Sequence, residues 1–408
     1  MASLQAKPLK IFILAGQSNM QGHARLETID YIGDDPATAP ILKAMRDADG
    51  KLHVCDKVWI SSVGCAGDDT TEVTGKLTAG FGASKGDIGP EFTFGIYMEK
   101  LLGEPILLIK TAWGGKSLNT DFRSPSAGPY VLSTFQKENY PKQEGHGIPK
   151  DFEKWKADKV KETGHYYRLM VEHVRSVTKD IKRVCPAYDE KQGYEIAGFV
   201  WLQGWNDMID SHTYPHGDVS GGYDVYADLL THFIRDVRKD LSAPKMPFVI
   251  GVMGVDGIQE RPNYFREAMA APAALPEFKG NVIAIQTAPF WDKKLGEIDE
   301  HSRNISQMNW ILSSKNKGGP NEDGKMTPEQ QAAYLKEYRA KLIPPADEAI
   351  WNRGASDAGY HYLGCAKTLA LMGKAFAEAT LKMQAQTAGR PPHSPAPPDA
   401  RPVSGAPQ

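Results

Sequence analysis

Short runs of apolar residues alternate along the chain with longer stretches in which apolar residues recur every three or four positions. A nearly continuous run of Val, Ile and Leu is typical of a strand buried on both faces of a parallel sheet. Such runs predict strands at 11–16, 57–63, 104–112, 195–204, 246–254 and 281–288. The helical spacing predicts helices at 91–102, in most of 151–183, at 224–240 and at 364–382. This order of elements predicts βαβ units and a three-layer α/β/α sandwich.

Three segments rich in loop-forming residues interrupt this alternation. They predict long loops at 64–90, 117–150 and 289–355. Long loops within a domain are often functional, so we expect them to form the walls of a cleft. The last segment, 389–408, is rich in proline and predicts a disordered tail that follows a single domain at 1–388.

Polar residues lie where several of the predicted strands end. Ser18 follows the first strand in "AGQSNMQGHA", "TAWGGKS" (111–117) follows the third and "QGWND" (203–207) follows the fourth. "SDAGYHYLG" (356–364) precedes the last helix. In an open parallel sheet the ligand crevice lies beyond the carboxyl ends of the strands, so we expect these four blocks to meet.

The residue types in these blocks suit nucleophilic catalysis. A serine hydroxyl becomes a nucleophile when a base, usually histidine, takes its proton. Gly114 and Gly115 leave backbone N–H groups accessible, and Asn206 offers a side-chain amide, so both blocks can supply donors to an oxyanion. Taken singly, each has a simpler interpretation: Ser18 as a helix N-cap, Asn206 in a turn and His361 in the core.

As an ordered set, the four blocks resemble the SGNH (GDSL-like) hydrolase superfamily, named for Ser, Gly, Asn and His. Within it the chain is similar to the sialate O-acetylesterase-like branch, carbohydrate esterase family 6, through "GQSNM" (16–20), "WGGKS" (113–117), "GWND" (204–207) and His361. The resemblance implies a flavodoxin-like parallel sheet in the α/β/α sandwich. It also implies Ser18 as the nucleophile, His361 as its base, and the Ser18 N–H, Gly115 N–H and Asn206 amide as the oxyanion hole.

The acid that would orient His361 departs from the family pattern, which is DxxH. Ala358 lies three residues before His361, and the nearest acid is Asp357, four before. We predict Asp357, provided that the backbone bends, as Gly359 would permit. Two alternatives stay open: a backbone carbonyl holds the ring in a Ser-His dyad, or Asp207 reaches across from the neighbouring strand.

The resemblance implies a serine esterase that removes O-acetyl groups from carbohydrates, of the acetylxylan esterase or sialate O-acetylesterase type, through an acetyl-enzyme intermediate. We predict that Gln17, Trp113, Gln203 and Trp205 bind the acetylated oligo- or polysaccharide, since aromatic faces stack on sugar rings. The alternative is a carbohydrate-binding protein without activity on the same fold. An α/β-hydrolase is excluded, because its serine would lie in GxSxG near mid-chain.

Charge and hydropathy exclude other partners. The 408 residues carry a formal net charge of -2, which leaves no basic excess for nucleic acid or a membrane surface. No apolar run approaches the roughly 20 residues of a membrane span, and the first residues lack the apolar region of a signal peptide. We expect a secreted or periplasmic protein whose leader is absent from this sequence.

Cysteine and histidine spacing predicts no metal site and no cofactor. The four cysteines have no CxxC spacing, so we expect buried free thiols, with a disulfide between Cys55 and Cys65 as the alternative. His212 and His216 have the spacing of metal ligands, but the proline between them favours a surface loop.

Overall fold

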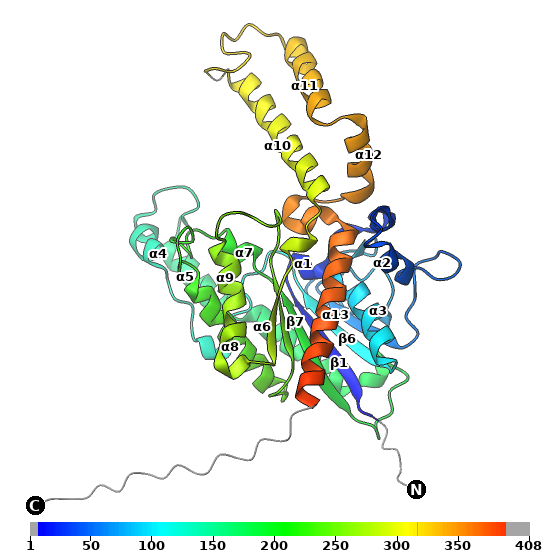
Figure 1. Cartoon of the computed structure of the whole chain (residues 1–408). Helices are drawn as coiled ribbons and strands as arrows, with labels where there is room; N and C mark the ends of the chain where they lie inside the picture. Colours follow the sequence, from blue (N-terminus) through cyan, green and yellow to red (C-terminus); the bar gives the residue numbers. More distant parts are fainter. Residues whose placement is uncertain (1–6, 316, 389–408) are drawn as a thin grey trace, which may run out of the picture.

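A seven-stranded sheet forms the centre of the computed structural model, which describes residues 7–315 and 317–388 (Figure 1). The strands lie in the order β4-β3-β6-β1-β7-β8-β9, and all pair in parallel except β4, which is antiparallel to β3. Their bounds are β1 Leu9–Gly16, β3 Val58–Val63, β4 Val73–Lys76, β6 Ile106–Ala112, β7 Tyr194–Leu202, β8 Phe248–Val252 and β9 Val282–Gln286. Two short strands, β2 (Ala24–Arg25) and β5 (Asp87–Ile88), pair separately.

The strand order is flavodoxin-like, as the resemblance implied. When β1, β6, β7, β8 and β9 are numbered along the chain, they lie in the order 2-1-3-4-5. The pair β3 and β4 extends the sheet beyond β6. In this order the ligand crevice forms beside the first strand, where the chain crosses from one half of the sheet to the other.

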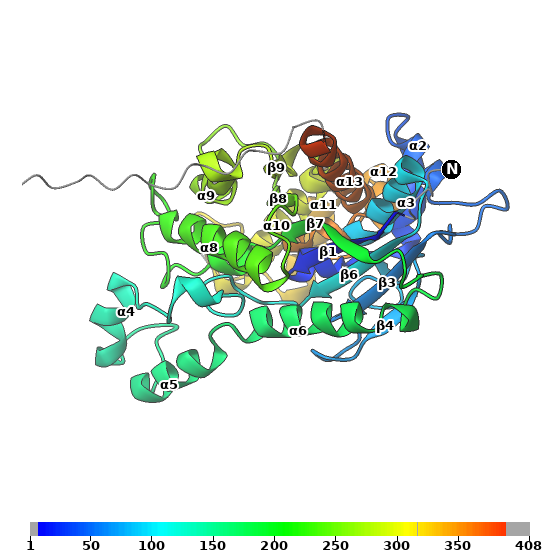
Figure 2. The same ribbon diagram turned by 90° about the horizontal axis from the view of Figure 1, so that it is seen from below.

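Helices cover both faces of the sheet, which confirms the α/β/α sandwich. One layer holds α3 (Pro90–Leu102) and α13 (Ala366–Ala388), and the opposite layer holds α6 (His165–Lys179) and α8 (Asp224–Asp240) (Figure 2). The predicted strands and these predicted helices are therefore present, with small differences at their ends. The other helices of the body are α1 Ser18–Gln21, α2 Ala39–Ala44, α4 Thr134–Asn139, α5 Phe152–Glu162, α7 Trp205–Met208 and α9 Tyr264–Ala270.

The amphipathic helices bury one stripe against the sheet. On α6 the buried residues Tyr167, Met170 and Val174 recur at intervals of three and four, which places them on one helical face. Strand β7 contributes Phe199 and Trp201, which are fully buried in the core. The strands are continuous apolar runs in the sequence because helices cover both faces of the sheet.

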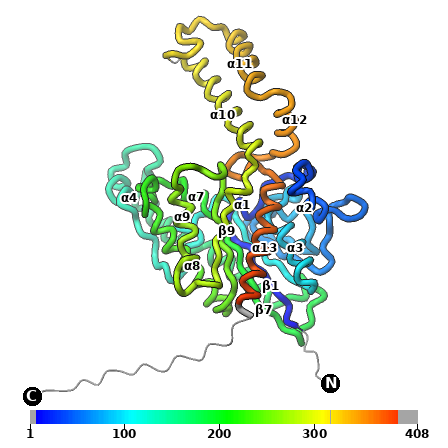
Figure 3. The backbone as a smooth tube through the Cα atoms, in the orientation of Figure 1, coloured from blue at the N-terminus to red at the C-terminus, as the bar shows by residue number. Residues whose placement is uncertain are grey.

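The predicted loop at 289–355 is wrong. Most of this segment forms three helices, α10 (Lys293–Ser314), α11 (Pro328–Leu342) and α12 (Pro345–Gly354), which we call the arm (residues 293–354). The arm projects from the body beyond the carboxyl ends of the strands (Figure 3). Its helices lack a strong apolar stripe because little of their surface is buried: α11 buries no residue and α10 buries Leu295, Ile298 and Leu312.

Because burial contributes little to the arm helices, hydrogen bonds from capping side chains help to fix where these helices begin. Asp292 accepts a hydrogen bond from the Leu295 N–H at the start of α10. Thr327 and Gln330 form a reciprocal capping box at the start of α11, with Pro328 in the first turn.

The other two predicted loops are largely irregular. Segment 64–90 contains the short strands β4 and β5 and ends at the first residue of α3, and segment 117–150 contains α4 and two short 3-10 turns. The predicted tail at 389–408 lies outside the described residues.

All four cysteines are free and buried, which confirms the interpretation as buried thiols. Among the described residues, no helix is both long enough and apolar enough to cross a membrane.

Candidate active site

Ser18 lies in a sharp turn from β1 into α1. The β1 residue Gly16 pairs with Ala112 of β6 and Leu202 of β7. A Cβ atom on Gly16 would lie 2.1 Å from the Leu202 carbonyl oxygen, so only glycine allows this turn. The turn places Ser18 in the first turn of α1, and it is 7% exposed.

The same register brings three of the predicted blocks together. Because Gly16, Ala112 and Leu202 lie level on adjacent strands, the chain segments that follow them leave the sheet at one edge. Gly115 follows β6 with a left-handed φ of 71° that favours glycine, and it is exposed. Asn206 follows β7, in the first turn of α7.

Gln17 fixes the orientation of Asn206. The Gln17 Nε2 donates to Asn206 Oδ1 at 2.9 Å. The Gln17 Oε1 accepts from the Gly204 N–H at 2.9 Å and from Gln203 Nε2 at 3.2 Å. Since the carbonyl oxygen of the Asn206 side chain is held by Gln17, its NH₂ group faces away from this network.

The three predicted oxyanion donors have N–H groups with no protein acceptor. Within 7–315 and 317–388, no residue accepts a hydrogen bond from the Ser18 N–H, the Gly115 N–H or the Asn206 NH₂ group. Other polar atoms around them, such as those of Gln17 and Asp207, are bonded. The donors are thus available to a ligand at the carboxyl edge of the sheet.

Asp207 is fully buried and serves the backbone. Its carboxylate accepts from the N–H groups of Leu118 (2.7 Å) and Asn119 (3.0 Å), from Gln203 Nε2 (2.6 Å) and from the Tyr214 hydroxyl (2.9 Å). Burial raises the pKa of Asp207 to about 6, against the opposing effect of these donors. These contacts tie the loop after β6 to the end of β7. None of them reaches His361, so the geometry does not support Asp207 as its acid.

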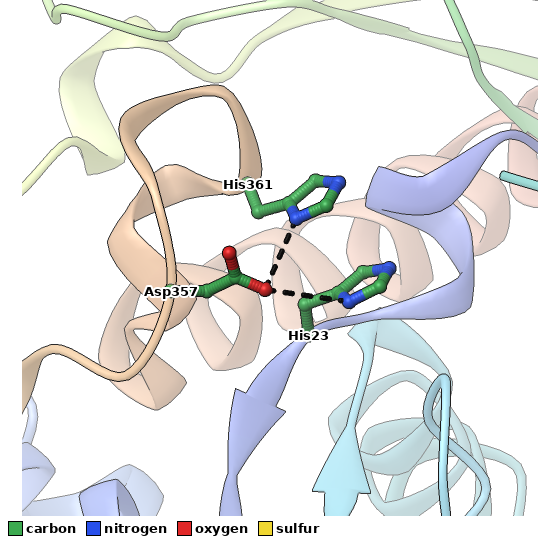
Figure 4. A group of neighbouring side chains, drawn as sticks. All are labelled: His23, Asp357 and His361. Atoms are coloured by element: carbon green, nitrogen blue, oxygen red, sulfur yellow. Dashed lines mark hydrogen bonds and ion pairs between the residues drawn. The ribbon is translucent and has the colours of Figure 1, made fainter. Parts of the chain in front are cut away.

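Asp357 contacts His361 directly (Figure 4). The His361 Nδ1 lies 3.1 Å from Asp357 Oδ2, and Asp357 Oδ1 accepts from the Ala358 N–H at 2.6 Å. The DxxxH spacing is therefore compatible with the contact that the family pattern implies.

The turn between Asp357 and His361 includes Gly359, without a positive φ there: the His361 N–H donates to the Ala358 carbonyl at 3.0 Å. Two non-glycine residues that follow His361 have left-handed φ values. Tyr362 and Leu363 have φ values of 53° and 61° within the 3-10 segment η8 (Gly359–Gly364). Such conformations are strained for these residue types and persist where surrounding contacts hold them. The Tyr362 hydroxyl accepts from the Gly254 N–H at 2.7 Å and lies 2.8 Å from Thr287 Oγ1.

A hydrogen bond joins the serine helix to the histidine segment. Asn19 Nδ2 donates to the Tyr360 carbonyl at 3.2 Å, so the neighbours of Ser18 and His361 are in contact. In the described residues no hydrogen bond links the Ser18 hydroxyl to His361 itself. Hydrogen bonds between catalytic groups are often long in the absence of substrate.

The carboxyl end of α1 rests on a buried cation. Lys110 Nζ donates to the carbonyls of Gln21 (2.7 Å) and Phe81 (2.6 Å) and to Glu91 Oε2 (2.8 Å). Lys110 and Glu91 are both completely buried. Lys110 thus fixes the turn that carries Ser18.

His23, which was not predicted as a site residue, stacks on His361. The two ring centroids lie 3.9 Å apart with an angle of 7° between the planes. His23 Nδ1 lies 3.4 Å from the Asp357 Oδ2 that also contacts His361. Burial, followed by the proximity of His361, lowers the pKa of His23 to about 4. Only the folded chain brings these two rings together, so no local sequence signal marked His23.

Among the residues that the structure describes, two clusters have ligand atoms close enough to suggest a metal ion: His23, Asp357 and His361, and the trio His53, Cys55 and Glu99. In the first, imidazole lone pairs lie in the ring planes, and the two planes are nearly parallel and stacked. A metal ion must lie about 2 Å from each ring nitrogen and close to each ring plane, so the stacked geometry does not suit a metal held by both histidines.

The predicted sugar contacts divide into buried and exposed residues. Gln17, Gln203 and Trp113 are at most 2% exposed, and the Trp113 Nε1 donates to the Asp69 carbonyl at 2.9 Å. Burial removes these three from direct substrate contact, and the hydrogen bonds of the two glutamines make them positioning residues. Trp205 is partly exposed, and its ring lies 5.8 Å from that of Tyr360, which is 44% exposed and was not predicted.

Comparison with known proteins gives a family. A family model described as a carbohydrate esterase, sialic acid-specific acetylesterase, matches residues 8–142 and 145–295. A search of curated proteins gives no match.

Two solved structures are similar in part. A protein from Arabidopsis thaliana is 18% identical, with a TM-score of 0.36 over 69% of this chain and 86% of that chain. A structure described as a novel carbohydrate acetylesterase from Xanthomonas citri is 13% identical, with a TM-score of 0.37 over 68% of this chain and 49% of that chain.

Proposed function

We propose that this chain, which belongs to the family of sialic acid-specific acetylesterases and is a carbohydrate acetylesterase, acts as a serine esterase through an acetyl-enzyme intermediate. The family favours an esterase over the alternative of a carbohydrate-binding protein without activity. The observation that carries the mechanism is the set of N–H donors at Ser18, Gly115 and Asn206, which have no acceptor in the described parts of the chain.

In the proposed reaction, Ser18 Oγ attacks the carbonyl carbon of the acetyl ester while His361 Nε2 takes the hydroxyl proton. The negative charge moves to the carbonyl oxygen, which accepts hydrogen bonds from the three donors. As the tetrahedral intermediate collapses, the bond to the sugar oxygen breaks, and His361 returns the proton to that oxygen. Water then releases acetate by the same steps and restores Ser18.

Asp357 has an orienting role in this reaction. Its Oδ2 lies 3.1 Å from His361 Nδ1, so it favours the tautomer that leaves Nε2 free to accept the serine proton. The carboxylate also stabilises the imidazolium that forms during attack.

The sugar would lie against Trp205 and Tyr360. Their rings are neighbours, and the Tyr360 ring lies edge-on to His361 with centroids 4.4 Å apart. A partly exposed aromatic pair beside the base offers apolar faces to a pyranose ring and a tyrosine hydroxyl at its edge. This arrangement supports the deacetylation of sugars, with the acetyl group directed toward Ser18.

Ser18→Ala tests the mechanism. We expect acetate release from a chromogenic acetyl ester to fall by about a thousandfold or more, with an unchanged circular dichroism spectrum. Ser62→Ala is the matched control, because Ser62 is a buried serine at the end of β3, and it should keep wild-type activity.

Mass spectrometry of the quenched wild-type enzyme should show an acetyl group on the peptide that contains Ser18. A folded Ser18→Ala variant with the wild-type rate would refute the serine mechanism. Parallel assays with acetylxylan and with O-acetylated sialic acid would identify the preferred sugar.

A further inference from the structure

His23 and His361 share one carboxylate oxygen. Asp357 Oδ2 lies 3.1 Å from His361 Nδ1 and 3.4 Å from His23 Nδ1, and the dashed lines of Figure 4 converge on this atom. The Asp357 side chain is 30% exposed and lies in a segment without regular secondary structure. A partly exposed carboxylate in such a segment needs several donors to keep one orientation.

We propose that His23 is a positioning residue of the esterase: its Nδ1–H donates to Asp357 Oδ2 and its ring packs on His361, so that the carboxylate and the base keep one alignment. This inference rests on the proposed function, since it assigns His361 as the base. His23 itself touches neither the serine nor the ester in this role.

Two hydrogen bonds and one close contact then hold the carboxylate. The Ala358 N–H holds Oδ1 at 2.6 Å, and the two histidines approach Oδ2 from stacked positions. His361 also packs against two rings, the stacked His23 ring at 3.9 Å and the Tyr360 ring at 4.4 Å, which is inclined at 71°. The base therefore has little freedom to rotate away from the serine helix.

The charge state of His23 suits this role. Burial holds its pKa at about 4, so above that pH the ring is neutral and does not oppose a positive charge on His361. The charged groups that act on the ring are His361, Asp357, Asp87 and Lys110. A neutral ring that donates from Nδ1 carries its proton there, which leaves His361 as the only one of the pair to become charged during attack.

Two variants separate the hydrogen bond from the ring contact. His23→Phe keeps a ring that can stack on His361 but removes the donor to Asp357. His23→Asn removes the ring but places an amide N–H near the position of Nδ1. Thermal unfolding of both variants would confirm that they are folded before kinetics are compared.

We expect His23→Phe to lower kcat by about tenfold with little change in KM, because a misaligned base is costly even when the displacement is small. The acid limb of kcat/KM should move to higher pH, because Asp357 would then direct its charge to His361 alone and stabilise the protonated ring. His23→Asn should keep kcat within about threefold of the wild type and leave the acid limb in place.

A wild-type kcat and pH profile for His23→Phe would overturn the proposal. An equal loss in both variants without movement of the acid limb would assign His23 to packing alone and overturn it as well. An NMR titration of the His361 ring in Ser18→Ala, with and without His23→Phe, tests the shared carboxylate without catalysis. A rise in the titration midpoint supports the inference even where the serine mechanism fails, and an unchanged midpoint contradicts it.

Discussion

The arm and the carboxyl edge of the sheet are neighbours that the chain stabilises in different ways. At the edge, Gln17, Gln203 and Asp207 are almost fully buried and bond to one another or to the loops beside them. In the arm, α11 buries no residue, Trp310 is 60% exposed, and the helices are defined by caps and by pairing with each other.

This difference suggests that the sheet edge carries the catalytic function, whereas the arm does not. A site that stabilises charge needs donors fixed in advance, and buried networks provide that rigidity. Helices held by caps and few apolar contacts open locally at low cost. We therefore expect substitutions at the sheet edge to change catalysis, and chemically matched substitutions in the arm to leave it unchanged.

The largest effect should come from Asp357→Asn. We expect activity to fall by about a thousandfold or more, because an amide at this position favours the wrong histidine tautomer. The matched arm variant is Asp299→Asn on α10, which removes an ion pair with Arg303 (3.3 Å) and should keep wild-type kcat/KM. Steady-state kinetics of both variants test the contrast, and a mild Asp357→Asn would favour a Ser-His dyad.

A second pair compares two asparagines. Asn206→Ala should lower kcat by roughly a hundredfold with KM little changed, since it removes one oxyanion donor. Asn321→Ala in the arm removes hydrogen bonds to the Leu312 carbonyl and the Met326 N–H, and it should loosen the tip without altering kcat. If Asn206→Ala changed KM alone, its amide would contact the ground state instead.

A third substitution concerns the stability of the sheet edge. The pKa of Asp207 is raised from 3.8 to about 6, so the folded protein binds more protons than the unfolded chain between these values. Its contribution to stability is therefore fully present below pH 4 and is lost as the pH rises through 6, by at most about 3 kcal/mol.

Urea unfolding between about pH 4 and pH 6 should show this pH-dependent loss of the free energy of unfolding in the wild type and not in Asp207→Asn. A difference between the two proteins that did not vary with pH would mean that Asp207 is ionised throughout.

The smallest effect should come from Thr327→Ala in the arm. Loss of the N-cap hydrogen bond should destabilise α11 by about 1 kcal/mol. Amide hydrogen exchange of α11 should accelerate while the exchange of β1, β6 and β7, the unfolding temperature of the body and the activity stay unchanged. Slower catalysis in this variant would show that the arm and the site are coupled.

The sheet was predictable because a strand covered on both faces must be apolar throughout. The position of Ser18, Gly115 and Asn206 at one edge then follows from parallel pairing of β1 with β6 and β7. The arm was missed because its residues lack an apolar stripe, although the signal of a helix start was present in "TPEQ" at 327–330.

The orientation of side chains was less predictable. The sequence places Gln17, Trp113 and Gln203 near strand ends, but it does not show that they turn inward and are buried. Likewise, His23 and Tyr360 gain their neighbours from segments that are more than 150 residues distant in sequence, as the His23–His361 stack and the Trp205–Tyr360 contact show.

The arm also changes the entropy cost of bringing the histidine segment back to the sheet. About 70 residues separate β9 from Asp357 and His361, and the entropy cost of closing a flexible loop grows with the logarithm of its length. Lys294 near the start of the arm forms an ion pair with Asp347 near its end, at 2.9 Å, so its helices fold back and bring its two ends together. The connection from β9 to Asp357 then behaves as a loop of roughly ten residues, which lowers the closure cost by about 1.7 kcal/mol. Local folding of the arm thus favours docking of the histidine segment onto a sheet that is already formed.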